Sequence, residues 1–256
     1  MSYFTFQNKQ VYYHELGHGT PILLLHGNTA SSVMFEEAAK KYMENHKVIL
    51  IDFLGHGKSQ RIHEIPANLW AFEAQQVIAF LEEKEHTSVN LIGSSGGALV
   101  AINVALERPD LIHKVIADSF EGEYPLQAFT ETIGEQRALS KQDKGAKAFY
   151  ISMHGDDWEQ VVDWDTQAIE RHSREIGKFF HKPLESFIPQ ILFTGSKEDE
   201  FVSELDVNLF EKTYNNMIKK IGQGEMFLFE KGSHPAMLSN LDAFVTISEN
   251  YLKNSA

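Results

Sequence analysis

Apolar residues along this chain form short continuous runs that are separated by segments with helical spacing. Two alternating segments open the chain, at 3–6 and 11–15, and we interpret them as an antiparallel hairpin. The later runs have no polar alternation, which is typical of parallel strands buried on both faces. These six runs lie at 22–25, 48–51, 89–92, 114–117, 191–193 and 226–229.

Helical candidates fill the intervals between the runs. Arg108 and Pro109 end the third candidate as a helix stop should. Strands that alternate with helices predict right-handed crossovers and an α/β fold with a mainly parallel, eight-stranded sheet. The candidates lie at roughly 31–45, 67–85, 96–107, 204–220 and 236–253.

One segment interrupts this alternation. Between Phe120 and Phe187 no strand is predicted, but apolar residues such as Trp158, Val161 and Val162 recur at helical spacing. We interpret about 120–187 as a helical cap inserted at the carboxyl edge of the sheet. The expected organisation is a single domain over 1–256, with core segments 1–119 and 188–256.

Composition narrows the function classes. A length of 256 residues suits one large α/β domain, and a net charge of −13 argues against nucleic acid or an anionic membrane as a partner. The chain has no cysteine, which excludes disulfides, thiolate catalysis and zinc–thiolate sites. The first residues have no apolar leader pattern, and no run approaches transmembrane length. We therefore expect a cytoplasmic protein without membrane insertion that acts on a small molecule; its oligomeric state stays open.

The chemistry is concentrated where predicted strands end. Gly93-Ser94-Ser95-Gly96-Gly97 follows the run 89–92 and leads into a predicted helix. A serine at the apex of a tight strand-to-helix turn needs small residues two positions before and after it, which Gly93 and Gly97 provide. This pattern makes Ser95 a candidate nucleophile.

Five such segments together resemble the α/β-hydrolase fold superfamily, over nearly all of the chain apart from the insertion. Segment 25–28 is similar to the family's His-Gly oxyanion motif, 52–59 to its Asp-x-x-Gly-x-Gly-x-Ser loop, and 93–97 to its nucleophile elbow. Segment 195–202 resembles the acid loop and 232–234 the histidine loop. The order Ser, Asp, His is also that of the family. The resemblance implies an α/β-hydrolase fold with a helical cap.

The resemblance assigns roles that chemistry explains. His234 takes the proton of the Ser95 hydroxyl during attack, and Asp199 orients and stabilises the imidazole. The backbone N–H groups of Asn28 and Gly96 bind the developing oxyanion. The residues expected to support these motifs are His26, Gly27, Gly93 and Gly97, and His56 is expected to shape its loop.

Several alternatives stay open. Asp118 ends a predicted strand from which some family members take the acid, and Glu198 and Glu200 flank Asp199. Ser94 is a second serine in the elbow, and its side chain is expected to point away from the apex. At Gly96 the family often has an apolar residue, so the added glycine either widens the pocket floor or loosens the elbow.

No cofactor or metal is expected. The chain has no phosphate-binding loop, dinucleotide motif or His-Glu-x-x-His pattern. His154, Asp156 and Asp157 could suggest a metal site, but we interpret the acidic run through Asp165 as a solvated helix face.

The predicted function is a cofactor-independent serine hydrolase of a small ester or related acyl compound, acting through an acyl-enzyme. One alternative is a carbon–carbon bond hydrolase with the same three residues, which needs arginines near the nucleophile; Arg137, Arg171 and Arg174 cannot be placed from sequence. Another is a low-turnover module that binds a small ligand. Specificity in this fold depends on the cap.

Overall fold

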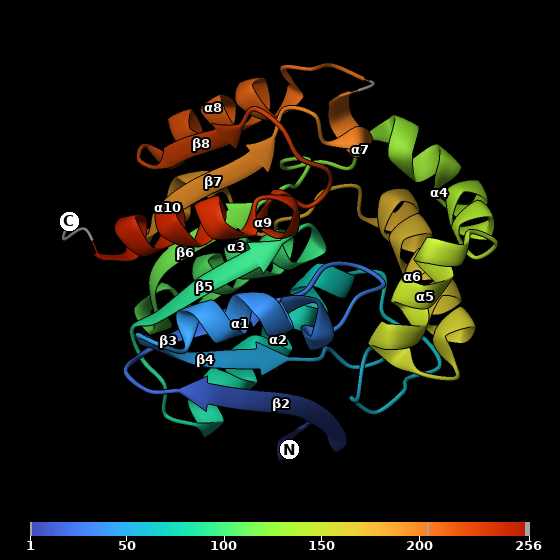
Figure 1. Ribbon diagram of the computed structural model, residues 1–256, viewed down its shortest axis with the longest axis horizontal. Helices are drawn as coiled ribbons and strands as arrows, with labels where there is room; N and C mark the ends of the chain where they lie inside the picture. Colours follow the sequence, from blue (N-terminus) through green and yellow to red (C-terminus); the bar gives the residue numbers. More distant parts are fainter. Residues whose placement is uncertain (1, 204, 254–256) are drawn as a thin grey trace.

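A single eight-stranded sheet runs through the molecule, with helices on both of its faces (Figure 1). The computed structural model describes residues 2–203 and 205–253. Strands β1 and β2 pair antiparallel, as do β2 and β4, and the other neighbours are parallel. The strands are β1 (Ser2–Phe6), β2 (Lys9–Gly17), β3 (Thr20–Leu25), β4 (His46–Ile51), β5 (Val89–Ser94), β6 (Ile112–Asp118), β7 (Gln190–Ser196) and β8 (Glu225–Phe229). The predicted mainly parallel, eight-stranded sheet is confirmed.

Strand order places the functional edge. The order is β1-β2-β4-β3-β5-β6-β7-β8, so the chain moves outward from β3 to β4 and then crosses back to β5. In open α/β sheets a crevice forms at the carboxyl ends of the strands where the order reverses. Here the loops after β3 and β5 flank that point.

The central strands are buried on both faces because their apolar runs alternate between two cores. Leu23 and Leu25 belong to the core under α2 (Leu69–Glu83) and α3 (Gly96–Glu107). Ile22 and Leu24 belong to the core under α1 (Glu36–Tyr42) and α10 (Leu241–Lys253). The continuous apolar pattern therefore reflects two-sided burial.

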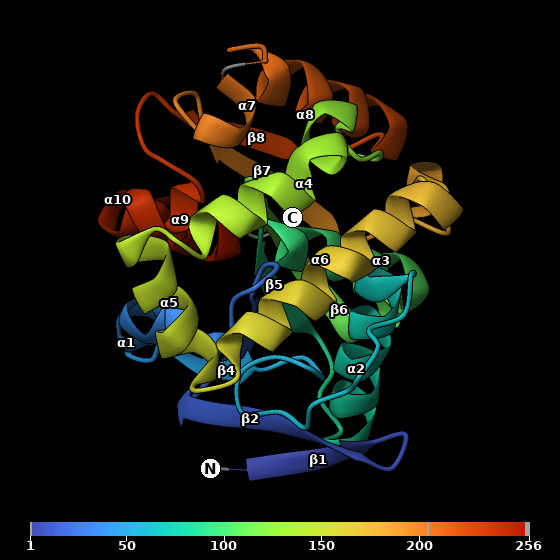
Figure 2. The same ribbon diagram turned by 90° about the vertical axis from the view of Figure 1, so that its right-hand side faces the viewer.

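Three helices between β6 and β7 lie beside the carboxyl ends of the strands. They are α4 (Gln127–Ser140), α5 (Lys144–His154) and α6 (Trp158–Glu175). Figure 2, viewed toward that edge, shows all three in front of the sheet. The remaining helices are α7 (Glu200–Ser203), α8 (Leu209–Ile221) and α9 (Ala236–Ser239), with 3-10 turns at Ser32–Phe35, Pro109–Leu111 and Leu184–Ser186.

Three predicted helices differ from those observed, and side-chain hydrogen bonds explain two of the differences. The helix expected over 31–45 opens as a 3-10 turn, and α1 ends at Tyr42. The helix expected from 204 begins at Leu209; position 204 lies outside the described residues, and the Asp206 side chain holds a turn by accepting from the Asn208 N–H at 2.9 Å. The helix expected over 236–253 is interrupted at Asn240, whose amide donates to the Lys231 carbonyl at 2.9 Å.

Among the described residues, every helix is too short or too polar to cross a membrane.

Candidate active site

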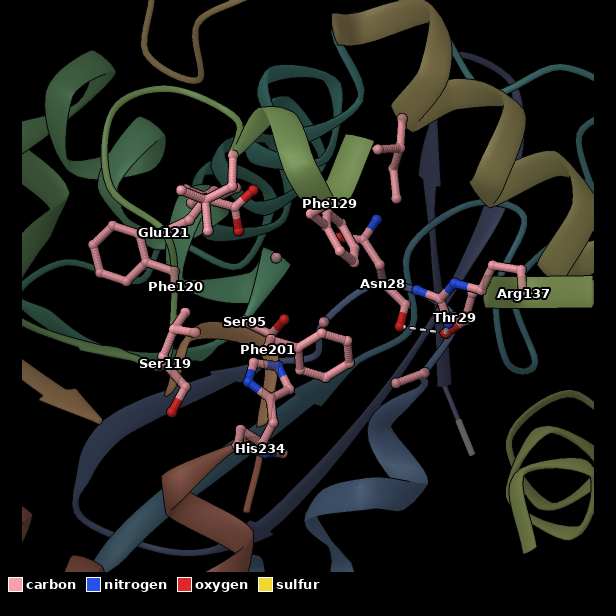
Figure 3. Close-up of a pocket in the computed structure, with 18 of the residues that line it drawn as sticks. Asn28, Thr29, Ser95, Ser119, Phe120, Glu121, Phe129, Arg137, Phe201 and His234 are labelled. Carbon is pink, nitrogen blue, oxygen red and sulfur yellow. Dashed lines mark hydrogen bonds between the residues drawn. The ribbon is translucent and has the colours of Figure 1, made fainter. Parts of the chain in front are cut away.

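Ser95 occupies a strained turn between β5 and α3. Its backbone has φ +55° and ψ −125°, a region that costs a non-glycine residue about 1–3 kcal/mol. Hydrogen bonds hold this conformation, because the Ser95 N–H donates to the Asp118 carbonyl at 2.8 Å and the Ser95 carbonyl accepts from the Ala98 N–H at 2.9 Å. The turn directs the Ser95 side chain into a cavity (Figure 3).

Glycines around Ser95 are required by close backbone approach. A Cβ at Gly93 would lie 2.0 Å from the Gly97 carbonyl oxygen, and one at Gly97 would lie 1.9 Å from the Leu25 carbonyl oxygen. A Cβ at Gly27 would lie 2.9 Å from the Cβ of Ser95. Because these positions have no side chain, β5, α3 and the loop after β3 can pack closely against one another.

The structure also explains why position 96 is a glycine, a question that the sequence left open. A Cβ there would lie 2.3 Å from Oδ1 of Asn28 and 2.9 Å from Nε1 of Trp70. These two atoms are hydrogen-bonded to each other at 3.2 Å. A side chain at position 96 would therefore displace the Asn28–Trp70 pair.

His234 and Asp199 come together from the loops after β8 and β7. Nδ1 of His234 lies 2.8 Å from Oδ2 of Asp199, which is fully buried and also accepts from the Phe201 N–H at 3.0 Å. Burial lowers the pKa of His234, but the hydrogen bond and charge of Asp199 outweigh it, so the net shift is upward. The acceptor on Nδ1 fixes the ring so that Nε2 is available on its other side.

Asp118, the alternative candidate for the acid, does not contact His234 through a hydrogen bond that the structure describes. Its carboxylate accepts from Ser94 Oγ at 3.0 Å, Thr194 Oγ1 at 2.8 Å and the Met237 N–H at 3.0 Å, and burial raises its pKa to about 6. Ser94 therefore points away from the apex of the elbow. The structure brings Asp199 to His234, whereas Asp118 ties together the loops beneath them.

The proposed oxyanion donors face the same cavity. Asn28 and Gly96 both line it, and their backbone N–H groups donate to no other residue that the structure describes. Gly96 is the first residue of α3, so the helix dipole adds positive potential there. His26 shapes this loop, with Nδ1 2.9 Å from the Gly27 carbonyl oxygen and Nε2 accepting from the Phe53 N–H at 3.2 Å.

Thr29, the residue after Asn28, is held by all three helices α4, α5 and α6. Its φ of +55° is unusual for a β-branched residue. Its N–H donates to Asp165 Oδ2 at 3.3 Å, its carbonyl lies 3.0 Å from His154 Nε2, and its hydroxyl accepts from Arg137 Nη1 at 2.7 Å. The conformation of the loop after β3 thus depends on contacts from α4, α5 and α6.

The solvated face predicted for the acidic run is confirmed for Asp156, Asp157 and Asp163, which are exposed, but it is wrong for Asp165. Asp165 is fully buried, and its Oδ2 accepts from Asn28 Nδ2 at 2.9 Å and contacts His56 Nε2 at 3.2 Å. Burial raises the pKa of Asp165, but the hydrogen bond and charge of His56 outweigh it, and the pKa is lowered overall. The candidates for a metal site diverge, since His154 binds Thr29 and Gly57 while Asp157 pairs with Arg61.

The cavity has a volume of about 490 Å³ and is mainly apolar. Leu99, Phe129, Phe149 and Ile169 are among its apolar lining residues. Arg137 and Glu121 enter it from opposite sides of Ser95 in Figure 3. Burial raises the pKa of Glu121 to about 7. Sequence reasoning did not name Glu121, Tyr150 or Trp70 individually as lining residues.

Comparison with known proteins places this architecture. A family model described as alpha/beta hydrolase fold matches residues 20–150. A pimeloyl-[acyl-carrier protein] methyl ester esterase of Aeromonas hydrophila is 24% identical, over 92% of this chain and 96% of its own length. An (E)-2-((N-methylformamido)methylene)succinate hydrolase of Acinetobacter baylyi is 30% identical over 112 residues, and that match spans 42% of this chain and only 40% of the relative.

Solved structures share the fold. An esterase from Exiguobacterium antarcticum superimposes with a TM-score of 0.76 at 20% identity, covering 96% of each chain. The family model covers just over half of the present chain and includes the loops that carry Asn28 and Ser95. The chain therefore belongs to the α/β-hydrolase fold family.

Proposed function

We propose that the chain is a serine hydrolase that cleaves small esters through an acyl-enzyme on Ser95. The observation that carries the proposal is the convergence on one cavity of a strained Ser95, an Asp199-bound His234 and two unengaged backbone N–H groups. These are the nucleophile, the oriented base and the oxyanion donors that acyl transfer needs.

The first half-reaction forms the acyl-enzyme. Ser95 Oγ attacks the acyl carbon while its proton passes to Nε2 of His234, whose Nδ1–H donates to Asp199. The carbonyl electron pair moves to oxygen, and the N–H groups of Asn28 and Gly96 bind the resulting oxyanion. When the intermediate collapses, the alcohol leaves with the proton from His234, and the acyl group stays on Ser95.

The second half-reaction releases the acid. A water molecule gives its proton to His234 and attacks the acyl carbon, and the same two N–H groups bind the oxyanion again. Ser95 then leaves and recovers its proton from His234. Each oxyanion donor contributes about 3 kcal/mol to stabilisation of the transition state.

The segment 120–187 acts as a cap in this proposal, with segments 1–119 and 188–256 as the catalytic core. Its helices carry cavity residues such as Phe129, Phe149 and Ile169, which suit an apolar part of the substrate. A volume of about 490 Å³ suits a small molecule. One relative is named as a hydrolase of a small succinate derivative, which supports a small substrate. Another is named as a methyl ester esterase that acts on pimeloyl-[acyl-carrier protein], which supports ester cleavage.

Carbon–carbon bond hydrolysis remains the second candidate, because Arg137 provides the arginine near the nucleophile that this reaction needs. A serine at position 95 disfavours dehalogenase chemistry, which proceeds through an aspartyl ester. Turnover of p-nitrophenyl esters without turnover of ring-fission diketones would support the esterase and exclude the carbon–carbon bond hydrolase. The cytoplasmic location stays a prediction.

Labelling with a fluorophosphonate probe tests the nucleophile. The wild type and Ser94→Ala should label, whereas Ser95→Ala should not; Ser94 is the matched control because its hydroxyl faces Asp118. A p-nitrophenyl ester series of increasing acyl length then measures kcat/KM. Equal labelling of the wild type and Ser95→Ala would overturn the assignment, and rapid labelling without turnover of any ester would favour the ligand-binding module.

A further inference from the structure

Arg137 places a positive charge in the cavity without an anionic partner. Its Nη1 donates to Thr29 Oγ1 at 2.7 Å and to Tyr150 Oη at 3.1 Å, both of which are neutral hydroxyls. No carboxylate of the described residues lies within 4.0 Å of this guanidinium. Because a guanidinium has five N–H donors, the donors on Nε and Nη2 remain for a ligand.

Of the other cations in this segment, Lys144, Lys147 and Lys178 do not line the cavity, and the rest are paired with carboxylates. Lys141 binds Asp163, Arg171 lies 3.7 Å from a carboxylate oxygen of Glu64, and Arg174 lies 2.9 Å from one of Glu175. Arg137 is therefore exceptional among the described cap residues in having its charged group at the cavity and only hydroxyls as partners. An arginine so placed suits recognition of an anion better than support of the fold.

Two acidic groups, Asp165 and Glu121, could offset the positive charge of Arg137, and neither pairs with it. Asp165 lies behind the cavity wall, and the charge of Arg137 contributes to its lowered pKa, but its Oδ2 is already occupied by Asn28, Thr29 and His56. Glu121 lies on the opposite side of the cavity, where burial raises its pKa to about 7. Neither carboxylate occupies the free edge of the guanidinium.

We propose that Arg137 and Tyr150 form a carboxylate-binding subsite, so that the acyl substrates of this enzyme carry an anionic group remote from the scissile ester. The Nε–H and Nη2–H edge of a guanidinium matches the two oxygens of a carboxylate. Tyr150 accepts from Arg137, which leaves its own O–H to donate to the same anion. Thr29 connects the subsite to Asn28, so the anion is held beside the oxyanion loop.

This subsite deepens the proposed esterase function and rests on it. A purely structural role is the competing interpretation, because Arg137 also holds the Thr29 hydroxyl. The two differ in what they predict for substrates of different charge. A subsite affects anionic substrates selectively, whereas a loop clamp affects all esters alike.

Matched substrates make the test. Mono-p-nitrophenyl esters of adipate, pimelate and suberate are compared with the same compounds methylated at the free carboxylate, by release of p-nitrophenolate. The enzymes are the wild type, Arg137→Gln, Arg137→Lys and Arg174→Gln; Arg174 is the exposed control on α6. The readout is the ratio of kcat/KM for the acid over that for its methyl ester.

The wild type should prefer at least one acid over its methyl ester, and Arg137→Gln should lower that ratio by about tenfold to a hundredfold. The ratio for Arg137→Lys should lie between those of the wild type and Arg137→Gln, because lysine keeps the positive charge but cannot bind both carboxylate oxygens as a guanidinium does. Arg174→Gln should keep the wild-type ratio. No preference for any acid, or an equal loss on both members of each pair in Arg137→Gln, would overturn the subsite.

Labelling of Ser95 separates this failure from that of the proposed function. Adipate and pimelate should protect wild-type Ser95 from the fluorophosphonate more strongly than they protect Arg137→Gln. Ser95 that labels and turns over neutral esters without such protection retains the proposed function and loses the subsite. Absence of both labelling and turnover removes both.

Discussion

Replacing Asp165 by alanine tests how strongly α6 supports the loop after β3, which carries the proposed oxyanion donor Asn28. The substitution removes the acceptor of three donors, at 2.9 Å from Asn28 Nδ2, 3.2 Å from His56 Nε2 and 3.3 Å from the Thr29 N–H. The Asn28 amide lines the cavity and can turn to water. His56 and Thr29 are buried, so each loses a partner without replacement.

The magnitude follows from these contacts. An unsatisfied buried polar group costs about 1–3 kcal/mol, and removing one member of a buried ion pair costs about 3–5 kcal/mol. We expect Asp165→Ala to lower the free energy of unfolding by about 3–5 kcal/mol. Asp165→Asn keeps one acceptor oxygen and should lose about half as much. Asp163→Ala, on the exposed face of the same helix, should lose less than about 1 kcal/mol.

Urea denaturation followed by circular dichroism measures these differences, provided that the m-values agree. Activity supplies a second readout, because Thr29 adjoins the proposed oxyanion donor at Asn28. The folded fraction of Asp165→Ala should lose up to about a hundredfold in kcat/KM, the amount associated with one misplaced oxyanion donor. An Asp165→Ala variant as stable as Asp163→Ala would refute the reasoning, and unchanged kcat/KM would refute the link to the loop.

Three further predictions concern ionisable groups. Asp199→Asn should lower kcat/KM by about 10³–10⁴-fold and Asp118→Asn by less than about tenfold, measured on one p-nitrophenyl ester; the reverse order would reassign the acid. Because His234 must be neutral to act as a base and its pKa is raised, the acid limb of kcat/KM against pH should lie above 6.5. Glu200→Gln removes a charge that raises this pKa, so the limb should move to lower pH, and an upward move would contradict the assignment. The folded-state pKa of Glu121, about 7, lies above its unfolded value, so its contribution to stability is complete below about pH 4.5 and is lost as the pH rises through 7. Relative to the wild type, Glu121→Gln should therefore gain up to about 3 kcal/mol in unfolding free energy between pH 5 and 8, measured by urea denaturation, and a constant difference would show that Glu121 titrates normally.

The sheet could be predicted because two-sided burial leaves a direct mark on sequence. Runs such as 22–25 and 48–51 have no polar residue, and this pattern has few alternatives. Helix ends were less predictable because single side-chain hydrogen bonds decide them. The amide of Asn240 and the carboxylate of Asp206 each stop or delay a helix through a partner that periodicity does not indicate.

The candidate site likewise contains residues that the sequence could predict and residues that it could not. Ser95, His234 and Asp199 each follow a strand within a few residues, so local motifs were enough to nominate them. Asp165 was misjudged because its acidic neighbours suggested solvent. Its spacing from Val161, Val162 and Ile169 was the signal that could have found it, since these four residues lie on one buried helical face. Arg137 and Thr29 are 108 positions apart, and only docking of the helices brings them together.

The docking of α4, α5 and α6 links the helices that line the cavity to the loop that carries the proposed oxyanion donor. Thr29 adopts a backbone conformation that a β-branched residue avoids, and α4, α5 and α6 each supply one hydrogen bond that holds it there. Asn28 precedes Thr29 directly, so we expect a shift of these helices that relaxes Thr29 to displace the proposed oxyanion donor as well. In the proposed enzyme, a change in α4, α5 or α6 that admits another substrate should therefore preserve all three contacts, because their loss should lower the rate.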